Sequence, residues 1–526
     1  MDTKALRQKI LDLAIRGKLV PQDPNDEPAS VLLERIRAEK QQMVKDGKLK
    51  PKDIKNDTII FVGEDNLHYE KFQNGSVKCI EDEIPFEVPK GWEWCRVRDI
   101  AAVKGGKRLP KGVGFSPCRT AHAYIRVTDM KNHSINTDDL KYISEEVFLQ
   151  IKNYTISKDD LYVTIAGTIG VTGEVPTELD GMNLTENAVK ITNIQINKTY
   201  LCLIIQSEFV QQQFQDKTHQ VAMPKLALER ILSTLIPVCT ITTQSAMVSK
   251  FVEMDSLINQ IREEKEILAE TVSLTKSKIL DLAIRGQLVP QDPNDEPASV
   301  LLERIRAEKE ELIKAGKIKR DKKESIIFRG EDNSYYQQTG TLIENINDWN
   351  LDDIPINWEL CCLGEICDYG NCVNVDTKDI DEEAWVLDLE DIEKDSGKVI
   401  HKIRKYERDS SSTKHLFKKG QVLYSKLRPY LNKVVLADEE GFCTSEILPL
   451  NFSNVVEPQY ALYYLMSPTF LKYANRCSYG VKMPRLGTAD GRKAVFPLPP
   501  FEEQRRISQH ISKIFIEIDN ISNMLL

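Results

Sequence analysis

The sequence contains no run of 18 consecutive apolar residues, and no charged segment followed by an apolar stretch stands at its N-terminus. The first absence argues against a membrane-spanning helix, and the second argues against a secretory signal peptide. We therefore expect a cytoplasmic protein. Its 526 residues, of which 41% are hydrophobic and 29% charged, suffice for two well-packed domains.

Paired cysteines are also missing. The eleven cysteines are scattered, apart from a group formed by Cys361, Cys362, Cys367 and Cys372. This group has no C-x2-C spacing and no histidine at ligand distance along the chain, so a metal site is a poor explanation for it. We expect ordinary buried thiols in a reducing compartment, and no bound metal.

Catalytic signatures are absent as well. An adenine methyltransferase needs an Asn/Asp-Pro-Pro-aromatic motif, but residues 499–501 lack the preceding amide. Residues 105–108 (GGKR) lack the glycine spacing and the Ser/Thr of a phosphate-binding loop, and the glycines at 167, 170 and 173 more plausibly mark a turn between strands. We expect no catalysis and no cofactor, with a DNA-modifying enzyme of diverged active site left open.

The net charge of −9 gives no general excess of positive charge for binding nucleic acid, but the charges are strongly segregated. Residues 351–400 carry −12, residues 401–430 carry +7, and residues 101–120 hold five basic side chains and no acidic one. Local fields govern binding more than the total does, so the negative total is a weak objection to DNA binding.

An internal repeat organises the chain. Residues 9–50 match residues 278–319 at 35 of 42 positions, and the match continues more loosely at 59–66 and 326–333. Ile84-Pro85 is echoed by Ile354-Pro355. After Trp92 and Trp358 the halves diverge for more than a hundred residues.

The halves converge again at VAMPKL (221–226) and VKMPRL (481–486). The chain is therefore two copies of one unit, alike in the frame and different in the middle. This pattern is expected when the frames dock on identical partners and the middles read different targets.

A long heptad seam follows the first variable middle. Apolar residues recur in steps of three and four up to Gly286, a natural C-cap; they are Phe251, Met254, Ile258, Ile261, Leu268, Val272, Ile279 and Leu282. A helix over about 244–285 would be roughly 60 Å long. The C-terminus repeats the first part of the seam, with isoleucines at 507, 511, 514, 518 and 521 and Leu525, and the N-terminus repeats the last part.

We infer a composite second helix made from both chain ends, and topology requires it to pair antiparallel with the central one. Packing of these helices on their own domains is the alternative. Residues 30–44 and 299–313 predict shorter amphipathic helices, which either pack in the core or contact partners.

The variable middles, about 90–240 and 356–500, mix short β-rich runs (123–127, 161–165, 421–425) with helical stretches (198–213, 459–474). We expect compact α+β domains with a curved sheet. Basic residues gather on the turns, where glycine lets a backbone approach a phosphate and Lys or Arg supplies charge.

The order and duplication of several motifs resemble the specificity subunits of type I restriction–modification systems. The motifs stand at residues 91–94, 106–112, 124–130, 164–170, 424–430 and 496–504. The resemblance implies that each variable domain reads one half of a split duplex target. It also implies that the helices set the gap between the halves and dock two methyltransferase (modification) subunits, and that motor-nuclease (restriction) subunits join the full complex. In the first half, residues 236–244 depart from the family's Pro-Leu-Pro-Pro pattern, which puts the start of the helix there in doubt.

The predicted organisation has five parts: conserved helices in 1–50, a first target-recognition domain with its lead-in in 51–240, the central coiled-coil helix and connector in 241–320, a second recognition domain with its lead-in in 321–500, and a C-terminal coiled-coil helix in 501–526. A coiled-coil scaffold that never touches DNA is the alternative function. The residues expected to contact DNA are Lys104, Lys107, Arg108, Lys111, Arg126, Thr164, Thr168, Lys225, Lys402, Arg404, Lys405, Lys418, Lys426, Arg428, Tyr430, Lys482, Arg485 and Arg492.

Overall fold

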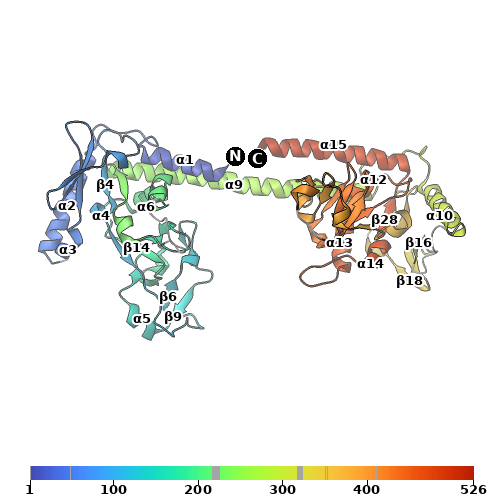
Figure 1. Ribbon diagram of the computed structural model, residues 1–526, viewed down its shortest axis with the longest axis horizontal. Coiled ribbons are helices and arrows are strands. Elements are labelled where there is room, and N and C mark those ends of the chain that lie inside the picture. The colour runs from blue at the N-terminus through green and yellow to red at the C-terminus, as the bar shows by residue number, and fades with distance from the viewer. Residues whose placement is uncertain are drawn as a thin grey trace. The chain divides into compact units, whose positions relative to one another are not determined.

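A computed structural model describes residues 2–47, 49–215, 225–316, 324–349, 351, 353–408 and 412–525. The chain forms two compact units, residues 1–263 and 264–526 (Figure 1). Within the described ranges, no helix is both long and apolar enough to cross a bilayer. The expected mixture of helices and sheets is present in both units, so the α+β prediction is confirmed.

The frame of the first unit consists of helices followed by a small antiparallel sheet in the order β1-β2-β3. Helix α2 buries Leu32, Leu33 and Ile36, which lie on one face of the predicted amphipathic helix. The frame elements are α1 (Thr3–Ile15), α2 (Ala29–Lys45), α3 (Pro51–Ile54), β1 (Thr58–Val62), β2 (His68–Phe72), β3 (Val77–Cys79) and η1 (Glu81–Glu83).

The variable domain of the first unit contains two four-stranded sheets, ordered β12-β11-β14-β5 and β10-β13-β6-β9, and the pairs β15-β4 and β7-β8. Its strands are β4 (Glu93–Arg96), β5 (Ala102–Gly105), β6 (His122–Ile125), β7 (Met130–Lys131), β8 (Ser134–Ile135), β9 (Lys141–Ile143), β10 (Thr155–Ile156), β11 (Leu161–Thr164), β12 (Thr172–Glu174), β13 (Met182–Leu184), β14 (Ala188–Thr192) and β15 (Leu235–Val238). Its helices are α4 (Val97–Ile100), η2 (Val127–Asp129), α5 (Glu145–Ile151), η3 (Thr177–Leu179), α6 (Lys198–Gln206), α7 (Glu208–Gln215) and α8 (Leu228–Leu232).

The second unit repeats this plan: β16-β17-β18 is its lead-in sheet, and β19-β28 repeats the β15-β4 pair. Its variable domain differs in the remaining sheets, which are β25-β24-β27 and the five-stranded β20-β23-β26-β21-β22. Its strands are β16 (Ser325–Arg329), β17 (Tyr335–Thr339), β18 (Leu342–Asn345), β19 (Glu359–Cys362), β20 (Val373–Val375), β21 (Trp385–Leu387), β22 (Ile403–Arg404), β23 (Lys414–Phe417), β24 (Val422–Ser425), β25 (Val434–Leu436), β26 (Gly441–Thr444), β27 (Ile447–Leu450) and β28 (Val495–Leu498). Its helices include α10 (Ala298–Lys314), η4 (Asn347–Trp349), α11 (Leu363–Ile366), η5 (Thr377–Asp379), η6 (Leu389–Asp391), η7 (Lys405–Glu407), η8 (Pro429–Leu431), α12 (Pro458–Met466), α13 (Pro468–Cys477) and α14 (Thr488–Lys493).

Each predicted helical stretch at the end of a variable domain is broken in two by a serine. Ser207 separates α6 from α7, and Ser467 separates α12 from α13. In both units the serine hydroxyl accepts a hydrogen bond from the backbone N–H three residues later, at 3.4 Å from Val210 and 3.3 Å from Phe470. An N-cap serine starts a new helix, and for this reason the two continuous helices expected from the sequence are wrong in this detail.

The central helix α9 (Ile241–Ile284) follows the predicted heptad seam: Phe251 and Ile258 are buried, while the positions beside them face solvent. In the first unit α1 lies against it, because Arg7 Nε donates to Asp255 at 2.8 Å and Ala14 shares a core with Met247 (Figure 1). Residue numbers rise along α1 as they fall along α9, so the two helices are antiparallel.

In the second unit, α15 (Phe501–Leu525) packs against the last part of α9 in the same way. Asp519 pairs with Lys276, and Glu503 accepts a hydrogen bond at 2.6 Å from Gln291, beyond the end of α9. This pairing is also antiparallel. The composite helix built from both chain ends stays a prediction, since α1 and α15 belong to different units.

The starts of α9 and α15 are alike despite the sequence departure at 236–244. The Gln244 side chain donates to the Cys239 carbonyl at 2.8 Å and accepts from Asn197 N–H at 2.9 Å. Gln504 donates to the Pro499 carbonyl at 2.9 Å and accepts from Glu457 N–H at 2.8 Å. The family's proline pattern is therefore not needed for this helix start.

The end of each frame helix fixes how the two halves align. Gly17 and Gly286 have φ values of +65° and +68°, and a Cβ on either would lie 2.4 Å from Pro89 or Pro355. Pro355 therefore corresponds to Pro89. The correspondence of Ile354-Pro355 with Ile84-Pro85 expected from the sequence is wrong, because the connector before Trp358 is shorter in the second unit.

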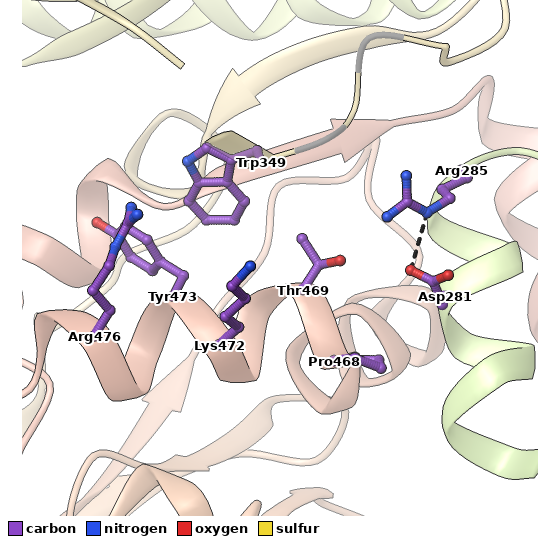
Figure 2. A pocket seen from close by; sticks show the side chains of 8 residues that line it. All are labelled: Asp281, Arg285, Trp349, Pro468, Thr469, Lys472, Tyr473 and Arg476. Carbon is purple, nitrogen blue, oxygen red and sulfur yellow. Dashed lines mark hydrogen bonds and ion pairs between the residues drawn. The ribbon is translucent and has the colours of Figure 1, made fainter. Parts of the chain in front are cut away.

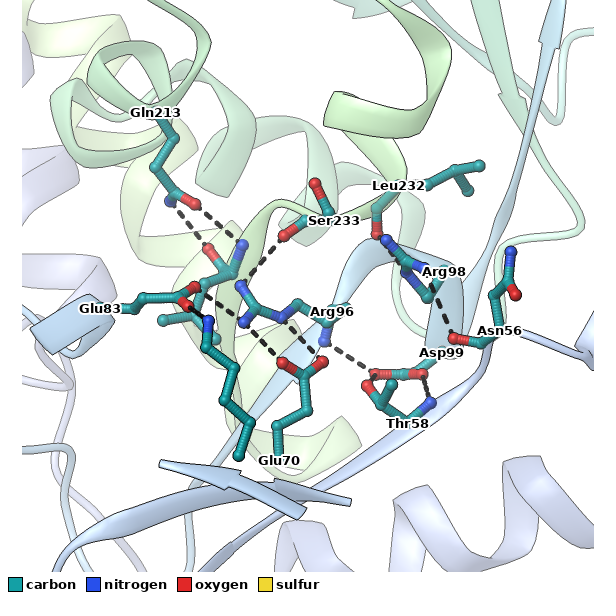
Figure 3. Close-up of polar contacts among 12 residues, drawn as sticks. Asn56, Thr58, Glu70, Glu83, Arg96, Arg98, Asp99, Gln213, Leu232 and Ser233 are labelled. Atoms are coloured by element: carbon teal, nitrogen blue, oxygen red, sulfur yellow. Dashed lines mark hydrogen bonds and ion pairs between the residues drawn. The ribbon is translucent and has the colours of Figure 1, made fainter. Parts of the chain in front are cut away.

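The lead-in sheet of the first unit is attached by a buried ionic network (Figure 3). Arg96 donates to Glu70 at 2.9 and 3.2 Å, to Glu83 at 2.8 Å and to the Ser233 carbonyl at 3.0 Å. The equivalent contact in the second unit is neutral, with Gln337 donating to Cys362 Sγ at 3.0 Å. The same frame is thus attached by charge in one unit and by neutral hydrogen bonds in the other.

A pocket of about 200 Å³ opens in the second unit beside α13. In the first unit Phe209 stands where Thr469 stands here, and its ring packs on Phe86, 5.8 Å away between centroids. The smaller threonine leaves the space open. The pocket is lined by Asp281, Arg285, Trp349, Pro468, Thr469, Lys472, Tyr473 and Arg476 (Figure 2).

Candidate nucleic-acid interface

The two variable domains share one small scaffold where the predicted basic turns meet. In the first unit, the chain after β11 hydrogen-bonds to the turn before β14 (Ile165 N–H to Asn187 carbonyl, 2.8 Å) and accepts from Leu226 N–H at 2.9 Å. In the second, Lys426 N–H donates to the Glu446 carbonyl at 3.0 Å, and the Lys426 carbonyl accepts from Leu486 N–H at 3.0 Å. Two otherwise different domains therefore keep the same three-segment junction.

In the first unit this junction gathers basic side chains around Glu186. Arg108 Nε donates to the Glu186 carboxylate at 2.6 Å, and Lys225 Nζ donates to the Glu186 carbonyl at 3.3 Å. Partial burial would raise the pKa of Glu186, but hydrogen bonds from Arg108 and Thr185 outweigh burial and lower it. The Glu186 carboxylate thus positions Arg108 at the surface, while the backbone carbonyl of the same residue positions Lys225.

The GGKR loop is clamped onto this turn. A Cβ on Gly106 would lie 2.0 Å from the Thr185 carbonyl oxygen, so no side chain fits there. Gly106 N–H donates to the Ala188 carbonyl at 3.1 Å, and Lys107 N–H donates to the Leu184 carbonyl at 2.9 Å. The close backbone contact presents Lys107, with Nζ 5.5 Å from the centre of the Tyr154 ring.

At the junction of the second unit the ion pair is Arg485 and Glu446, with Glu446 at the place that Asn187 takes in the first unit. The guanidinium donates to the carboxylate at 2.7, 3.0 and 3.1 Å, and these bonds lower the pKa of Glu446. Beside it, Arg428 has the left-handed φ of +50°, and its N–H donates to the Pro484 carbonyl at 2.7 Å. A non-glycine residue held in this region is uncommon and is frequently found at functional sites.

Much of the positive segment 401–430 is neutralised by its own domain. Lys402 pairs with Asp438 at 3.0 Å, Arg404 with Glu439 at 2.8 Å and Lys405 with Glu382 at 3.3 Å. Charge segregation along the sequence therefore overstates the field at this surface, because acidic side chains distant in sequence fold back onto the basic ones.

Two further basic residues are held inside the domains. Arg126 donates to Asp129 at 2.6 Å and to the Asp139 carbonyl at 2.7 Å, which fixes the η2 turn. Arg492 Nε donates to the Tyr369 carbonyl at 2.9 Å. These contacts give both side chains structural roles that the sequence did not indicate.

The Thr164 side chain, expected from the sequence to contact DNA, is enclosed in the turn that follows β11. Thr164 is fully buried; its hydroxyl donates to the Thr168 carbonyl and accepts from Val171 N–H at 3.0 Å. It closes the glycine-containing turn between β11 and β12, while Thr168 itself is exposed. Its hydroxyl therefore stabilises the turn.

The remaining predicted residues lie at the surface of the described structure and have no ion pair within it. Lys225 is the first residue of the described range 225–316, and residues 221–224 of its motif lie outside the described residues. The sequence did not point to Glu186 and Glu446; the signal that could have found them is an acidic residue just before the strand that precedes the helical stretch of each variable domain, β14 in the first unit and β27 in the second. The surface residues are Lys104, Lys107, Lys111, Lys225, Lys418, Lys426 and Lys482.

Neither the cysteines nor the other titratable groups form a metal site: the described residues contain no group of three or more His, Cys, Asp or Glu side chains placed to hold an ion. Cys361 is fully buried, and burial raises the pKa of its thiol far above the ordinary value. Such a thiol packs as an apolar group.

Known proteins are similar to this chain in both of its halves. Residues 89–270 and 355–525 match the type I restriction modification DNA specificity domain. The specificity subunit of the type I restriction enzyme EcoEI from Escherichia coli is 29% identical over 414 residues, which cover 69% of this chain and 61% of that subunit. The chain thus spans about three fifths of the length of that relative.

Two other similarities extend over more of the chain. The EcoAI specificity subunit of Escherichia coli is 26% identical over 588 residues, covering 97% of this chain and 88% of that subunit. A chain from a solved structure on the assembly and conformational transition of the type I R-M system superposes with a TM-score of 0.51 at 16% identity, covering 84% of this chain and 94% of that one. The latter likeness concerns the fold alone.

Proposed function

Because this chain belongs to the family of type I restriction modification DNA specificity domains, we propose that it is the DNA-reading subunit of a type I restriction–modification complex. Each variable domain binds one half of a bipartite duplex target. The paired helices set the gap between the halves and dock two modification subunits, and motor-nuclease subunits join in the full complex. The chain itself acts in the cytoplasm without catalysis or a cofactor of its own.

The observation that carries this proposal is the repeated junction. Lys225 and Arg485 occupy equivalent places, each beside an acidic turn, in two domains whose sheets differ. A cation at the same place in both halves suits contact with the repeating phosphate backbone, while the different surroundings suit different base sequences.

The proposed contact surface follows from the geometry of the two junctions. Arg126, Lys402, Arg404, Lys405 and Arg492 belong to it only in a secondary role, because their side chains are held by contacts other than those with the junction acids Glu186 and Glu446. The primary set is Lys104, Lys107, Arg108, Lys111, Thr168 and Lys225 in the first unit, and Lys418, Lys426, Arg428, Tyr430, Lys482 and Arg485 in the second.

The test is a domain exchange. Residues 90–240 are replaced by the corresponding domain of another family member, and the methylated sites are read by methylome sequencing of cells that carry the intact system. One half of the recognised sequence should change, and the other half should stay as it was. A change in both halves or in neither would contradict the assignment of one half-site to each unit.

A scaffold that never touches DNA is the second candidate, and the net charge of −9 favours it. A labelled duplex containing the methylated site separates the two candidates. Retention of the duplex by the chain together with its modification subunits, and not by the modification subunits alone, supports DNA reading. Equal retention without the chain supports the scaffold.

A further inference from the structure

A short loop of the second unit, residues 479–485, is closed at its base like a hairpin. Tyr479 N–H donates to the Arg485 carbonyl at 3.1 Å, and Arg485 N–H donates to the Tyr479 carbonyl at 3.0 Å. Gly480 has φ +103°, a conformation that L side chains rarely adopt. We call these seven residues the apolar finger.

The finger exposes large apolar side chains. Val481 is 102% exposed, Tyr479 is 63% exposed and Met483 is 45% exposed. Isolated apolar residues are ordinary on a protein surface, but three within five positions on one loop form a patch without a folding role. Val481 makes no contribution to the core, so its position at the tip needs another explanation.

The base of the finger is rigid. Arg485 is fixed on Glu446 by three hydrogen bonds of 2.7–3.1 Å, and its Nη1 donates to the Met483 carbonyl at 3.0 Å. From the opposite side, Arg428 N–H donates to the Pro484 carbonyl at 2.7 Å. A tip held this way loses little conformational entropy when it inserts into a partner.

The charges around the finger indicate what the partner is. Lys482 stands at the tip between the two apolar side chains, and Lys426 and Arg428 lie on the segment bonded to its base. No described acidic side chain pairs with Lys482. An apolar tip bordered by cations matches a partner with apolar base steps inside a polyanionic backbone, which is the chemistry of duplex DNA.

The tip residues recur in the other half of the sequence. Val481 and Met483 of VKMPRL match Val221 and Met223 of VAMPKL, while the residue between them differs. A buried residue of the lead-in sheet, by contrast, is not kept, since Gln337 stands where Glu70 stands in the first unit. Packing in the second unit gives no reason for keeping an exposed valine.

We propose that the apolar finger is a wedge: Val481 and Met483 enter a groove of the duplex and unstack one base step in the half-site of the second unit. This inference rests on the proposed function. Apolar wedges of this kind partly unstack and kink DNA, and the extra protein contact offsets the cost of unstacking. The exposed ring of Tyr430, on the neighbouring η8 turn, lies on the same part of the chain as Arg428 and contributes to the same surface.

The experiment uses the chain assembled with its modification subunits and duplexes that carry the methylated target. 2-Aminopurine replaces one base at a time through each half-site, and its fluorescence reports unstacking. We expect a rise at one step of the second half-site on binding. The double variant V481S/M483S should lose this rise and bind the duplex roughly tenfold more weakly.

Two control variants make the result specific. Leu342→Ser removes another exposed apolar side chain, 54% exposed, from β18 and should leave both fluorescence and affinity unchanged. Lys482→Ala should weaken binding and reduce its salt dependence while the fluorescence rise remains. All three changes are at exposed sites, where an effect on folding is small.

Three outcomes would overturn the wedge. If the wild-type complex binds the duplex and no reporter position in the second half-site responds, the finger does not unstack DNA, although the proposed function stands. If V481S/M483S loses modification subunits instead of duplex affinity, the finger docks a protein. Failure of the wild-type complex to bind any duplex would remove the proposed function and the wedge together.

Discussion

Arg485 and Glu446 face each other across the junction of the second variable domain, with Nη2 2.7 Å from Oε1 and Nε 3.0 Å from Oε2. This two-point geometry fixes the plane of the guanidinium as well as its position. In the first unit Lys225 reaches only the backbone oxygen of Glu186, at 3.3 Å. The second unit therefore presents a guanidinium of fixed orientation, and the first unit presents an ammonium group whose orientation is not fixed.

This difference predicts the effect of removing each cation. Arg485→Ala should lower duplex affinity by roughly tenfold and relax discrimination in the second half-site alone. Lys225→Ala should weaken binding to all targets alike and reduce the slope of log affinity against log salt by about one. Binding measured at several salt concentrations with mismatches in either half-site checks both, and equal effects of the two variants would contradict the distinction.

The buried network around Arg96 predicts unequal costs at matched positions of the two lead-in sheets (Figure 3). Glu70→Ala leaves the buried guanidinium with Glu83 as its remaining carboxylate and should cost about 3 kcal/mol. Gln337→Ala removes neutral hydrogen bonds and should cost about 1 kcal/mol. Urea unfolding followed by hydrogen exchange in β2 and β17 measures both, and similar losses would argue against the role of charge.

The buried carboxyl group of Asp99 predicts that the free energy of unfolding depends on pH. It accepts hydrogen bonds from Thr58 N–H at 2.7 Å and Arg96 N–H at 2.9 Å, yet burial raises its pKa to about 6. The folded state therefore holds the proton more tightly than the unfolded state, so this group's contribution to stability falls as the pH rises from about 4 to 6, by about 3 kcal/mol.

The variant Asp99→Asn tests this directly. It cannot titrate, so the difference in free energy of unfolding between wild type and variant should change across pH 4–6 and be constant above it. A difference that is independent of pH would show that folding does not raise the pKa of Asp99.

The helices predict the spacing of the target. Seven residues inserted into α9 near 263, with the same heptad added after Leu525, lengthen both predicted partners by about 10 Å, or about three base pairs. Methylome sequencing should then find unchanged half-sites with a wider gap. An insertion of four residues in one helix alone breaks the pairing and serves as the control; an unchanged gap in the matched variant would contradict a ruler.

The sequence predicted the elements that depend on periodicity. The seam at Phe251 and Ile258, the frame helices α2 and α10, and the strands β11 and β24 all formed where apolar spacing placed them. The duplication and the family resemblance are confirmed by the two matched domains. Helix breaks at Ser207 and Ser467 were not predicted, because the apolar pattern continues through a serine that the backbone uses as a cap.

The site was harder to predict, because the function of a basic residue depends on acids distant in sequence. Lys402 and Asp438 are separated by more than thirty positions, yet their 3.0 Å contact removes a cation from the expected surface. Thr164 shows the same limit for a motif. Its hydroxyl stabilises a turn, and the neighbouring sequence does not distinguish a threonine with this role from one that contacts a ligand.

Each unit contains frame helices, one part of α9, a lead-in sheet and a variable domain. The main hydrophobic core of each unit is built from residues of that unit alone. A gene encoding one such half would already specify a folding domain, and joining two copies in tandem would then free each middle to change independently. On this view a new target needs no redesign of the protein: exchange of one interchangeable cassette by recombination between the nearly identical flanking segments is enough.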